Sequence, residues 1–388
     1  MQENAFQVAI IGAGLGGLCL AQGLKRHGIA FAVFERDAAL DSRSQGYRIR
    51  INPDGQAALR RCLPPELFAL FEASCGAALN PPQALDARLN GVARWNDAWR
   101  SEEPGAADLK ANRHTLREVL MCGIAEHVHF GKELRGVVRH GGDGVSFDFA
   151  DGSAYRADLL VGADGSNSRV AAQCFPDMRG LDAGVVCIYG KADGASPSIA
   201  DALRGGTSVI FDGQLAMVID PMRFSPAGNG GLSPVEDYLY WALIGRRQRL
   251  GVTAGMMPCE ADARRCIADL SAGWAPGLRA VFGATPPGML TMLPVRQSPP
   301  PLAWPQGRVT ALGDAVHTMS PASGLGCNTA FLDAALLAAQ LAGASRGAAT
   351  LDQAVATYEA GMREQAAAAL QASESGAREL YGGDICGF

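Results

Sequence analysis

The 388-residue chain lacks several features that would place it in other classes of protein. No apolar run approaches the roughly 20 residues that a membrane-spanning helix needs. The opening stretch, MQENAFQ, has neither a basic segment nor an apolar one, so we expect no secretory signal and a cytoplasmic location. The net charge is −5 and the 34 Lys and Arg are scattered, which argues against a nucleic-acid partner.

Residues at metal-binding spacing are also missing. The ten cysteines contain no C-x-x-C pair, and the six histidines form no cluster beyond His127-x-His129, so we predict no metal site. In a long chain without an export signal, cysteines among apolar neighbours are expected to be reduced core thiols. With 48% hydrophobic and 19% charged residues, the composition is that of a globular protein with room for two domains.

The strongest positive signal is the stretch from Val8 to Asp37, which reads as a buried strand, a helix and a second strand. Gly12, Gly14 and Gly17 follow the first strand at the spacing G-x-G-x-x-G. They permit a tight turn, close approach of a pyrophosphate, and close helix–strand packing, in that order. The helix N-terminus attracts phosphate, and Glu35 ends the second strand, where it can accept bonds from a ribose hydroxyl. The stretch predicts a dinucleotide-binding unit.

Other segments are interpreted more coarsely. Residues 46–51 alternate as a strand that places Arg48 and Arg50 on one face. Two such arginines could bind a cofactor phosphate, NAD(P)H or an anionic substrate, or simply be solvated. Residues 56–70 are expected to be helical with an interruption at Pro64-Pro65, and residues 79–100 to form a hairpin turning at Asn90-Gly91.

The second half of the chain has a different pattern of residues. Residues 180–294 alternate, carry aromatics and are broken by Gly and Pro, which predicts an antiparallel sheet with one helix over 260–274. Buried strands are expected near residues 158–162 and 308–312, on either side of this sheet, so it reads as an inserted substrate domain. The Ala-rich stretches 331–344 and 351–380 predict helices that pack over the domain or against a second subunit.

Three separate stretches together resemble the class A flavoprotein monooxygenases, the para-hydroxybenzoate hydroxylase-like family. They are GAGLGG at 12–17, DLLVGADGSNSRV at 158–170 and GDAVHTMSPASGLGCNTAFLDAALL at 313–337. The resemblance implies an α/β fold in which a Rossmann-like FAD-binding domain with a parallel sheet is interrupted by an antiparallel-sheet substrate domain and followed by C-terminal helices. The expected bounds are 1–75, 101–180 and 290–345 for the FAD-binding domain, 76–100 and 181–289 for the substrate domain, and 346–388 for the helical segment.

The resemblance also implies that FAD is held at both ends. Asp314, after a buried strand, would accept bonds from ribityl hydroxyls, with a helix N-cap as the alternative. Arg113 matches the family's Arg-x-x-Leu position, Asp164 its D-G turn, and Asn328 would add hydrogen-bond donors near the flavin. The full set of expected cofactor-binding residues is Gly12, Gly14, Leu15, Gly16, Gly17, Glu35, Arg36, Arg113, Asp164, Asp314, Gly324, Gly326, Cys327 and Asn328.

One position departs from the family pattern. Ala171 stands where members usually carry Arg, and whether Arg169 replaces that arginine stays open. No second G-x-G-x-x-G appears, so the resemblance implies that NAD(P)H docks only transiently. Reduced flavin would then react with O2 to give a C4a-hydroperoxide that hydroxylates or epoxidises a small, aromatic substrate. The protein would be a monomer or a homodimer.

The substrate pocket is expected beneath the inserted sheet, with ordinary core packing as the alternative for each lining residue. The candidates are Arg50, Phe211, Met217, Tyr240, Trp241 and Pro321. His317 and Arg48 are candidates for a catalytic role, although His317 could instead hold its loop by hydrogen bonds. Alternative functions are a tetracycline-destructase-like hydroxylase, a flavin oxidase that needs no nicotinamide, and a flavin-binding carrier without turnover.

Overall fold

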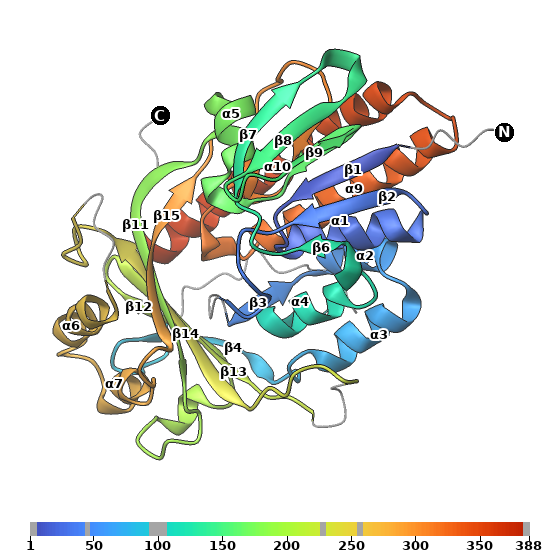
Figure 1. Ribbon diagram of the computed structural model, residues 1–388. Coiled ribbons are helices and arrows are strands. Elements are labelled where there is room, and N and C mark those ends of the chain that lie inside the picture. Colours follow the sequence, from blue (N-terminus) through green and yellow to red (C-terminus); the bar gives the residue numbers. More distant parts are fainter. Residues whose placement is uncertain (1–5, 43–46, 93–106, 226–229, 254–258, 383–388) are drawn as a thin grey trace.

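The computed structural model describes residues 6–42, 47–92, 107–225, 230–253 and 259–382 (Figure 1). Its first layer is a five-stranded sheet in which every neighbouring pair is parallel. The strands are short and nearly all of their residues are buried, as in a sheet covered on both faces. Their order across the sheet is β16 (Val309–Ala311), β10 (Leu159–Gly162), β1 (Gln7–Ile11), β2 (Ala30–Phe34) and β6 (Val128–His129).

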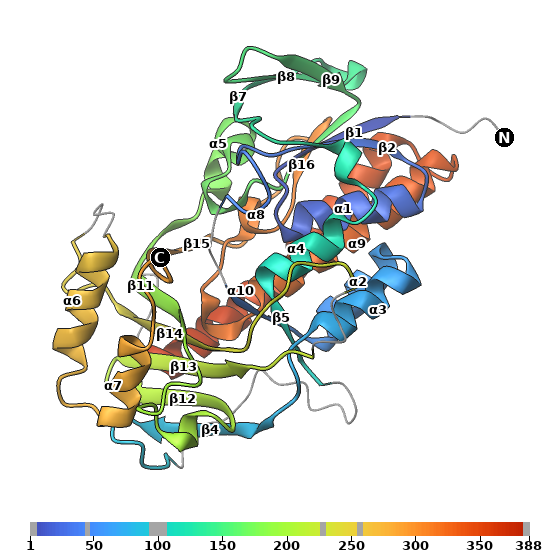
Figure 2. The ribbon, with the colours of Figure 1, turned by 60° about the horizontal axis from the view of Figure 1, so that its bottom comes forward.

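Helices cover one face of this sheet and a small antiparallel sheet covers the other (Figure 2). On the helical side α9 contacts α1, α2 and α10, and the chain breaks between α2 and α3 at Pro64-Pro65, as predicted. On the other side Phe34 contacts the rings of Phe147 and Phe149. The elements are α1 (Leu15–Arg26), α2 (Pro53–Cys62), α3 (Pro65–Ser74), α4 (Arg113–Met121), α9 (Gly326–Ser345), α10 (Leu351–Tyr381), β7 (Leu134–Arg139), β8 (Val145–Phe149) and β9 (Ala154–Ala157).

The predicted second sheet is present and has six strands. All neighbouring pairs are antiparallel except β12 and β4, which are parallel. The order is β15 (Leu290–Gln297), β11 (Leu181–Ala192), β14 (Tyr238–Arg246), β13 (Leu215–Met222), β12 (Gly206–Asp212) and β4 (Asn80–Asp86).

Two local expectations in this region need correction. The single helix predicted over 260–274 ends earlier, as α6 (Glu260–Leu270), and a second helix, α7 (Pro276–Gly283), follows it because Pro276 can occupy a first helical turn. Within the described residues the hairpin after β4 forms, with Val92 N–H donating to Ala84 O, but its tip lies at residues 87–89 rather than at Asn90-Gly91. The part of this prediction over residues 93–100 lies outside the described residues.

Two elements connect the sheets. A ribbon of β3 (Arg48–Ile51) and β5 (Leu109–Asn112) lies between them, as the β3 label in Figure 1 and the β5 label in Figure 2 show. Helix α10 runs from the parallel sheet, where Tyr358 donates to Ala311 O, to the six-stranded sheet, where Tyr381 joins a buried cluster with Val185 and Ile244. The sheets are thereby fixed relative to each other by a helix that contacts both.

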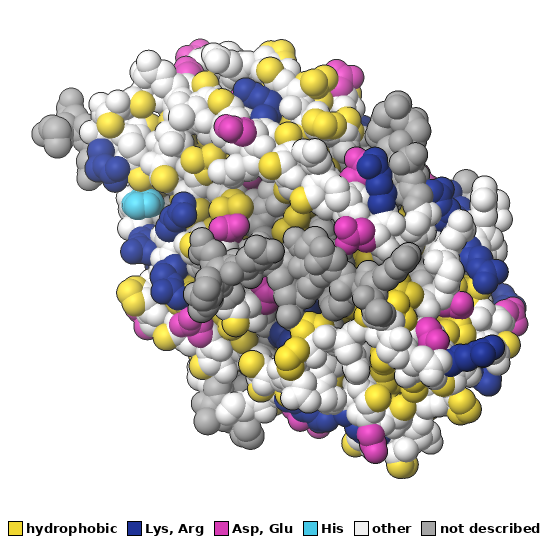
Figure 3. Space-filling model, turned by 180° about the vertical axis from the view of Figure 1, so that it is seen from behind, with side chains coloured by type: hydrophobic (Ala, Val, Ile, Leu, Met, Phe, Trp, Pro, Cys, Tyr) yellow, Lys and Arg dark blue, Asp and Glu magenta, His cyan; other side chains and the backbone are white. Residues whose placement is uncertain are grey.

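The surface and the helices give few clues to binding partners. On the face drawn in Figure 3, Lys and Arg lie in separate small groups among acidic and apolar side chains. Within the described part of the chain, no helix has both the length and the apolarity to cross a membrane.

Candidate functional site

The glycine turn after β1 lies at the carboxyl edge of the parallel sheet, where α/β proteins place ligands. Gly12 has a φ of +110°, and a Cβ there would lie 2.4 Å from Ala163 O. A Cβ on Gly17 would lie 2.1 Å from Gly12 O. A Cβ on Gly14, by contrast, would meet only Ala163 O, at 3.9 Å. The backbone is therefore packed tightly behind the turn and open beside Gly14.

The first turn of α1 offers unsatisfied N–H groups to this open space. Its N-cap is Gly14, which supplies no capping side chain, and the first turn contains no acidic residue. A helix N-terminus of this kind favours an anion, as a diphosphate is. The side chain of Leu15 is buried, and a Cβ on Gly16 would lie 2.8 Å from Leu312 Cδ1, so these two predicted contact residues have only backbone to offer.

Glu35 lies beside the same turn. Its carboxylate accepts the Ala13 N–H at 2.8 Å and the Asp37 N–H at 3.0 Å, and a carboxylate has lone pairs left for ribose hydroxyls. Arg117, which the sequence analysis missed, donates from Nη2 to Ala13 O at 3.1 Å and from Nη1 to Leu40 O at 2.7 Å. Arg36, predicted to bind the cofactor, is exposed.

The late segment begins where β16 ends and is held by a buried acid. Asp333 Oδ2 accepts the Gly313 N–H at 2.9 Å and lies 2.6 Å from His317 Nε2. His317 and Asp333 are both fully buried. Burial lowers the pKa of His317, but the charge and hydrogen bond of Asp333 raise it by a larger amount, so the net shift is upward. This contact agrees with the alternative in which His317 holds its loop.

Asn328 ties the late segment to the β3–β5 ribbon. Its amide nitrogen donates to Gly324 O at 2.9 Å and to Arg50 O at 3.1 Å, and its Oδ1 accepts the Asn52 N–H at 3.0 Å. Gly55 makes room for this arrangement, since a Cβ there would lie 2.1 Å from Asn328 Oδ1. Both amide hydrogens are thus engaged, and Asn328 contributes by positioning the loop around Gly324.

Asp314, in the short helix α8 (Asp314–His317), is accessible yet surrounded by protein. Its side chain is exposed, but desolvation raises its pKa despite the opposing charges of His317 and Arg113. Burial likewise raises the pKa of the half-buried Cys327 thiol to about 12. Among described residues, none hydrogen-bonds or ion-pairs with the Arg113 guanidinium. Polar side chains that solvent reaches although protein surrounds them are expected in the wall of a recess.

These residues fit FAD. The open Gly14 turn and the α1 N-terminus suit the diphosphate, Glu35 the ribose, and Asp314 the ribityl hydroxyls. Helix α9 begins at Gly326 with no capping side chain and no acid in its first turn, so its positive end favours the electron-rich side of a flavin. The residues that would contact the two ends of the cofactor come from segments about 300 residues apart in the sequence.

The central D-G turn is organised around Asp164. Its carboxylate accepts bonds from the Ser168 hydroxyl, from Arg169 N–H at 2.7 Å and from Val170 N–H at 3.2 Å. Desolvation nevertheless raises its pKa. The Arg169 guanidinium donates to Leu134 O at 2.7 Å and pairs with Glu133. Arg169 is therefore committed to the β7 side of the fold, although a cofactor role for Asp164 remains a prediction.

The six-stranded sheet places the expected pocket residues on two different faces. Met217 and Trp241 are fully buried against α6 and α7, and Trp241 Nε1 donates to Thr285 Oγ1 at 2.8 Å. Their placement in the pocket is wrong, because side chains alternate along a strand and these two point away from the parallel-sheet layer. Tyr240 is on the opposite face. Phe211 shares that face and packs in the cluster around Tyr381.

The face that carries Tyr240 combines accessible side chains with strong desolvation. Tyr240 is half-buried, yet burial raises its phenol pKa far above the usual value, and burial raises that of Cys187 to about 12. Arg50 of the ribbon lies beside Gly324 and pairs with Asp108 at 2.6 Å. Pro321 opens the adjoining 3-10 turn and is exposed. Of the predicted pocket residues, Tyr240 and Arg50 are best placed between the sheet and the late segment.

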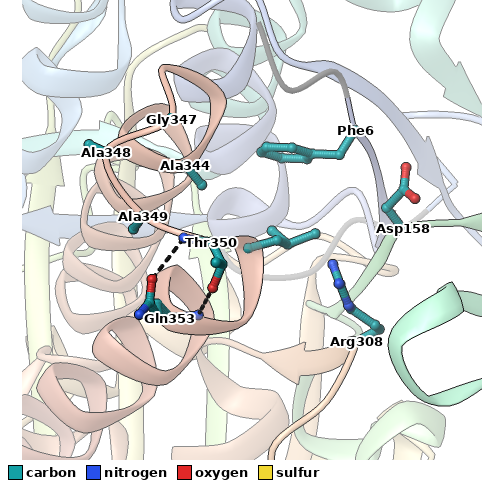
Figure 4. Close-up of a pocket in the computed structure, with 10 residues that line it drawn as sticks. Phe6, Asp158, Arg308, Ala344, Gly347, Ala348, Ala349, Thr350 and Gln353 are labelled. Atoms are coloured by element: carbon teal, nitrogen blue, oxygen red, sulfur yellow. Dashed lines mark hydrogen bonds between the residues drawn. The ribbon is translucent and has the colours of Figure 1, made fainter. Parts of the chain in front are cut away.

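A cavity of about 480 Å³ opens at the opposite, amino edge of the parallel sheet (Figure 4). Phe6, Asp158 and Arg308, which line it, immediately precede strands β1, β10 and β16. Asp158 already accepts the Gln7 N–H at 2.7 Å, and Arg308 lies 3.1 Å from Asp352. Its polar groups are used within the protein, and the strand ends that carry the candidate site lie at the other edge.

Comparisons with known proteins identify the family. The profile of an NAD(P)-binding Rossmann-like domain matches residues 10–59, and that of an FAD binding domain matches residues 287–373. A putative FAD-containing monooxygenase from Photorhabdus luminescens is 30% identical, with 97% of this chain and 99% of that chain covered and a TM-score of 0.82. The chain belongs to the FAD-dependent monooxygenases.

Two further members show how far the family likeness extends. Aurachin C monooxygenase/isomerase of Stigmatella aurantiaca is 30% identical over 87% of this chain and 80% of that protein. A dual O-methyltransferase/FAD-dependent monooxygenase of Cercospora beticola is 33% identical over 97% of this chain but only 46% of its own length. The chain thus spans about half the length of this dual-function relative. A Klebsiella pneumoniae protein, HpxO, solved with FAD and uric acid, shares the fold with a TM-score of 0.79 at 23% identity.

Proposed function

We propose that this chain is an FAD-dependent, NAD(P)H-using monooxygenase that hydroxylates or epoxidises a small aromatic molecule. The observation that carries the proposal is the convergence at one sheet edge of two uncapped helix N-termini, α1 and α9, with the accessible Asp314. The chemistry that bound FAD would supply is transfer of electrons from NAD(P)H to O2, with one oxygen atom entering the substrate and the other leaving as water.

The chain's own contribution is to hold the cofactor and to keep water away. The Gly12–Gly17 turn and Glu35 would bind the adenosine diphosphate half, and Asp314 would orient the ribityl chain. Asn328 and the His317–Asp333 pair fix the loop on which Gly324 lies. The apolar and aromatic face of β11 and β14, with Tyr189 and Tyr240, would shield a reactive site from solvent.

The experiment that tests this proposal measures three quantities on purified protein. We expect bound FAD at one per chain, bleaching of the flavin by NADH or NADPH in the absence of oxygen, and O2 consumption that depends on an aromatic substrate. Incorporation of one labelled atom from 18O2 into the product would identify a monooxygenase. Absence of FAD, or a flavin that neither nucleotide reduces with a panel of aromatic compounds present, would overturn the proposal.

One observation supports a second candidate, a flavin oxidase that needs no nicotinamide. Ala171 stands where the family resemblance leads us to expect an arginine, and the nearby Arg169 is engaged by Leu134 O and Glu133. The central turn therefore offers no other described guanidinium between residues 164 and 174 for a nicotinamide nucleotide. Anaerobic reduction by the organic substrate alone would favour the oxidase, whereas reduction by NADPH would favour the monooxygenase.

A further inference from the structure

An ionic cluster on the six-stranded sheet contains more positive than negative charge. Asp220, on β13, is fully buried and lies 2.7 Å from Arg48 Nε. Its other oxygen contacts Lys110 Nζ and accepts the Thr207 hydroxyl at 3.0 Å. One carboxylate thus faces two cations, from β3 and β5 of the ribbon. Both cations are largely buried, since the side chains of Arg48 and Lys110 are only 17% and 16% exposed.

The cluster lies at one end of the face that carries Tyr240. Asp220 is directly opposite Tyr240 in the strand register, and Lys191 is opposite Tyr240 on its other side. The Lys191 ammonium lies 4.8 Å from the Tyr238 ring centroid, which adds a third cation to this end. Arg48 and Arg50 share one face of β3, and Arg50 lies beside Gly324. Arg48 therefore lies between the sheet and the late segment.

Part of the Arg48 guanidinium has no acceptor in the protein. Its contact with Asp220 is through Nε, and no described residue accepts a hydrogen bond from its two terminal nitrogens. Those nitrogens are also not sealed from solvent, unlike Nε. A partly buried guanidinium with unused donors and an excess of positive charge around it favours a planar anion. Asp220 compensates part of the cost of burying Arg48 and fixes its orientation.

We propose that Arg48, positioned by Asp220, recognises an ionised oxygen of the substrate, either a carboxylate or a phenolate on an aromatic ring. This inference rests on the proposed function and names its substrate class. The ring of the substrate would lie along the Tyr189 and Tyr240 face, and its anionic group would meet Arg48. The same arrangement disfavours a neutral ring of equal size, because that ring would cover unpaired N–H donors without replacing their water.

The test compares matched two-ring probes on the FAD-loaded, oxidised enzyme: 2-naphthoate, 2-naphthol and 2-methoxynaphthalene. Binding is measured by changes in flavin absorbance and by calorimetry, so that no turnover is needed. We expect Arg48→Met to weaken binding of ionised 2-naphthoate by about 10- to 100-fold and of the neutral ether by less than about 3-fold. Arg48→Lys keeps the charge and the ion pair but loses the planar fork, so an intermediate loss is expected.

The controls separate recognition from fold and from the proposed function. Arg135→Met removes the same charge from an exposed site on β7 and should change no affinity. FAD content and flavin reduction by NADPH report the proposed function independently of probe binding. If Arg48→Met does not hold FAD, Arg48→Lys alone decides. Equal weakening of all three probes, or a wild-type enzyme that binds no anionic probe more tightly than the ether, would overturn the inference. So would a higher KM for NAD(P)H in Arg48→Lys with unchanged probe affinities.

2-Naphthoate and 2-naphthol also distinguish the source of the charge, provided that 2-naphthol is measured at neutral pH and near about pH 10, where its hydroxyl ionises. Selective weakening of 2-naphthoate would assign a carboxylate to the substrate, and selective weakening of 2-naphthol a phenolate. Either result supports the role of Arg48. Asp220→Asn provides a second readout for the positioning role, because it should lower the discrimination between anionic and neutral probes while leaving the FAD content unchanged.

Discussion

The two ends of the candidate cofactor site are built by different physical means. At the first glycine turn the geometry is set by backbone contacts between neighbours in sequence or in the sheet, with Gly12 and Gly17 against each other and against Ala163. At the late segment the geometry is set by side chains, and their partners come from distant parts of the chain, as Asn328 with Asn52 and Ser320 with Tyr381. The first end has no room for an added atom at Gly12 or Gly17, whereas the second depends on a series of individual hydrogen bonds.

The largest expected effect is therefore at the first end. Gly17→Ala would place a Cβ 2.1 Å from Gly12 O and 3.2 Å from Ala163 Cβ, and backbone cannot move aside without opening the turn. We expect loss of FAD retention and a destabilisation of about 3 kcal/mol, measured by the flavin-to-protein ratio and by urea unfolding. Gly343→Ala, in the helix α9 with nothing within 4 Å, is the matched control and should stabilise the protein slightly. Normal FAD content in Gly17→Ala would contradict the steric account.

At the late segment the largest effect should come from the buried His317–Asp333 pair. His317→Gln leaves Asp333 without its charged partner, and a destabilisation of about 2 kcal/mol is expected. The pKa of His317 is raised in the folded protein, so its stabilising contribution is fully present below about 6.5, the unfolded value, and is lost as pH rises through the folded pKa. The difference in free energy of unfolding between wild type and variant should thus be larger at pH 6 than at pH 9. An increase with pH would contradict this sign.

A third change separates stability from cofactor binding. Desolvation raises the pKa of Asp314, so its ionised form disfavours the cofactor-free fold at neutral pH. Asp314→Asn should therefore raise the Tm of the apoprotein at pH 8, with little change at a pH low enough to protonate the wild-type acid. It should also weaken FAD binding by about 10-fold, the loss of one charge-assisted hydrogen bond. The readouts are thermal unfolding of the apoprotein and FAD titration, and an unchanged FAD affinity would remove Asp314 from the site.

The contrast between the two ends also explains what the sequence could predict. The strand, glycine turn, helix and acid of residues 8–37 are local, and the structure places Glu35 beside Ala13 as the pattern implies. The contacts of Asn328 and the role of Arg117 join segments about 280 and 100 residues apart, and no local pattern distinguishes Arg117 from a surface residue of a helix.

The six-stranded sheet shows a different kind of limit. Tyr240 and Trp241 are adjacent in one strand, so period-two alternation already excluded both from the same pocket. The alternation alone does not tell which of the two side chains points into the recess. That is decided by α6 and α7, which cover the Trp241 side, and α7 was not predicted. The family motifs were enough to predict the fold and the cofactor. Identifying the side chains that face the substrate required knowing how both layers pack.

The smallest expected effect concerns the link between α10 and the late segment. Tyr381 OH lies 2.9 Å from Ser320 Oγ, one residue before Pro321, and Ser373 donates to Ser320 O at 3.1 Å. Tyr381→Phe removes one buried neutral hydrogen bond and should cost about 1 kcal/mol, with FAD content unchanged. Ser320 keeps its bond to Ala322 N–H, so the loop should stay in place. Thr357→Val, which removes an exposed hydroxyl on the same helix, is the control, and urea unfolding measures both. A Tyr381→Phe variant that loses FAD would contradict this account. It would mean that the late segment depends on this single contact rather than on the set of hydrogen bonds that Asn328 and Asp333 provide.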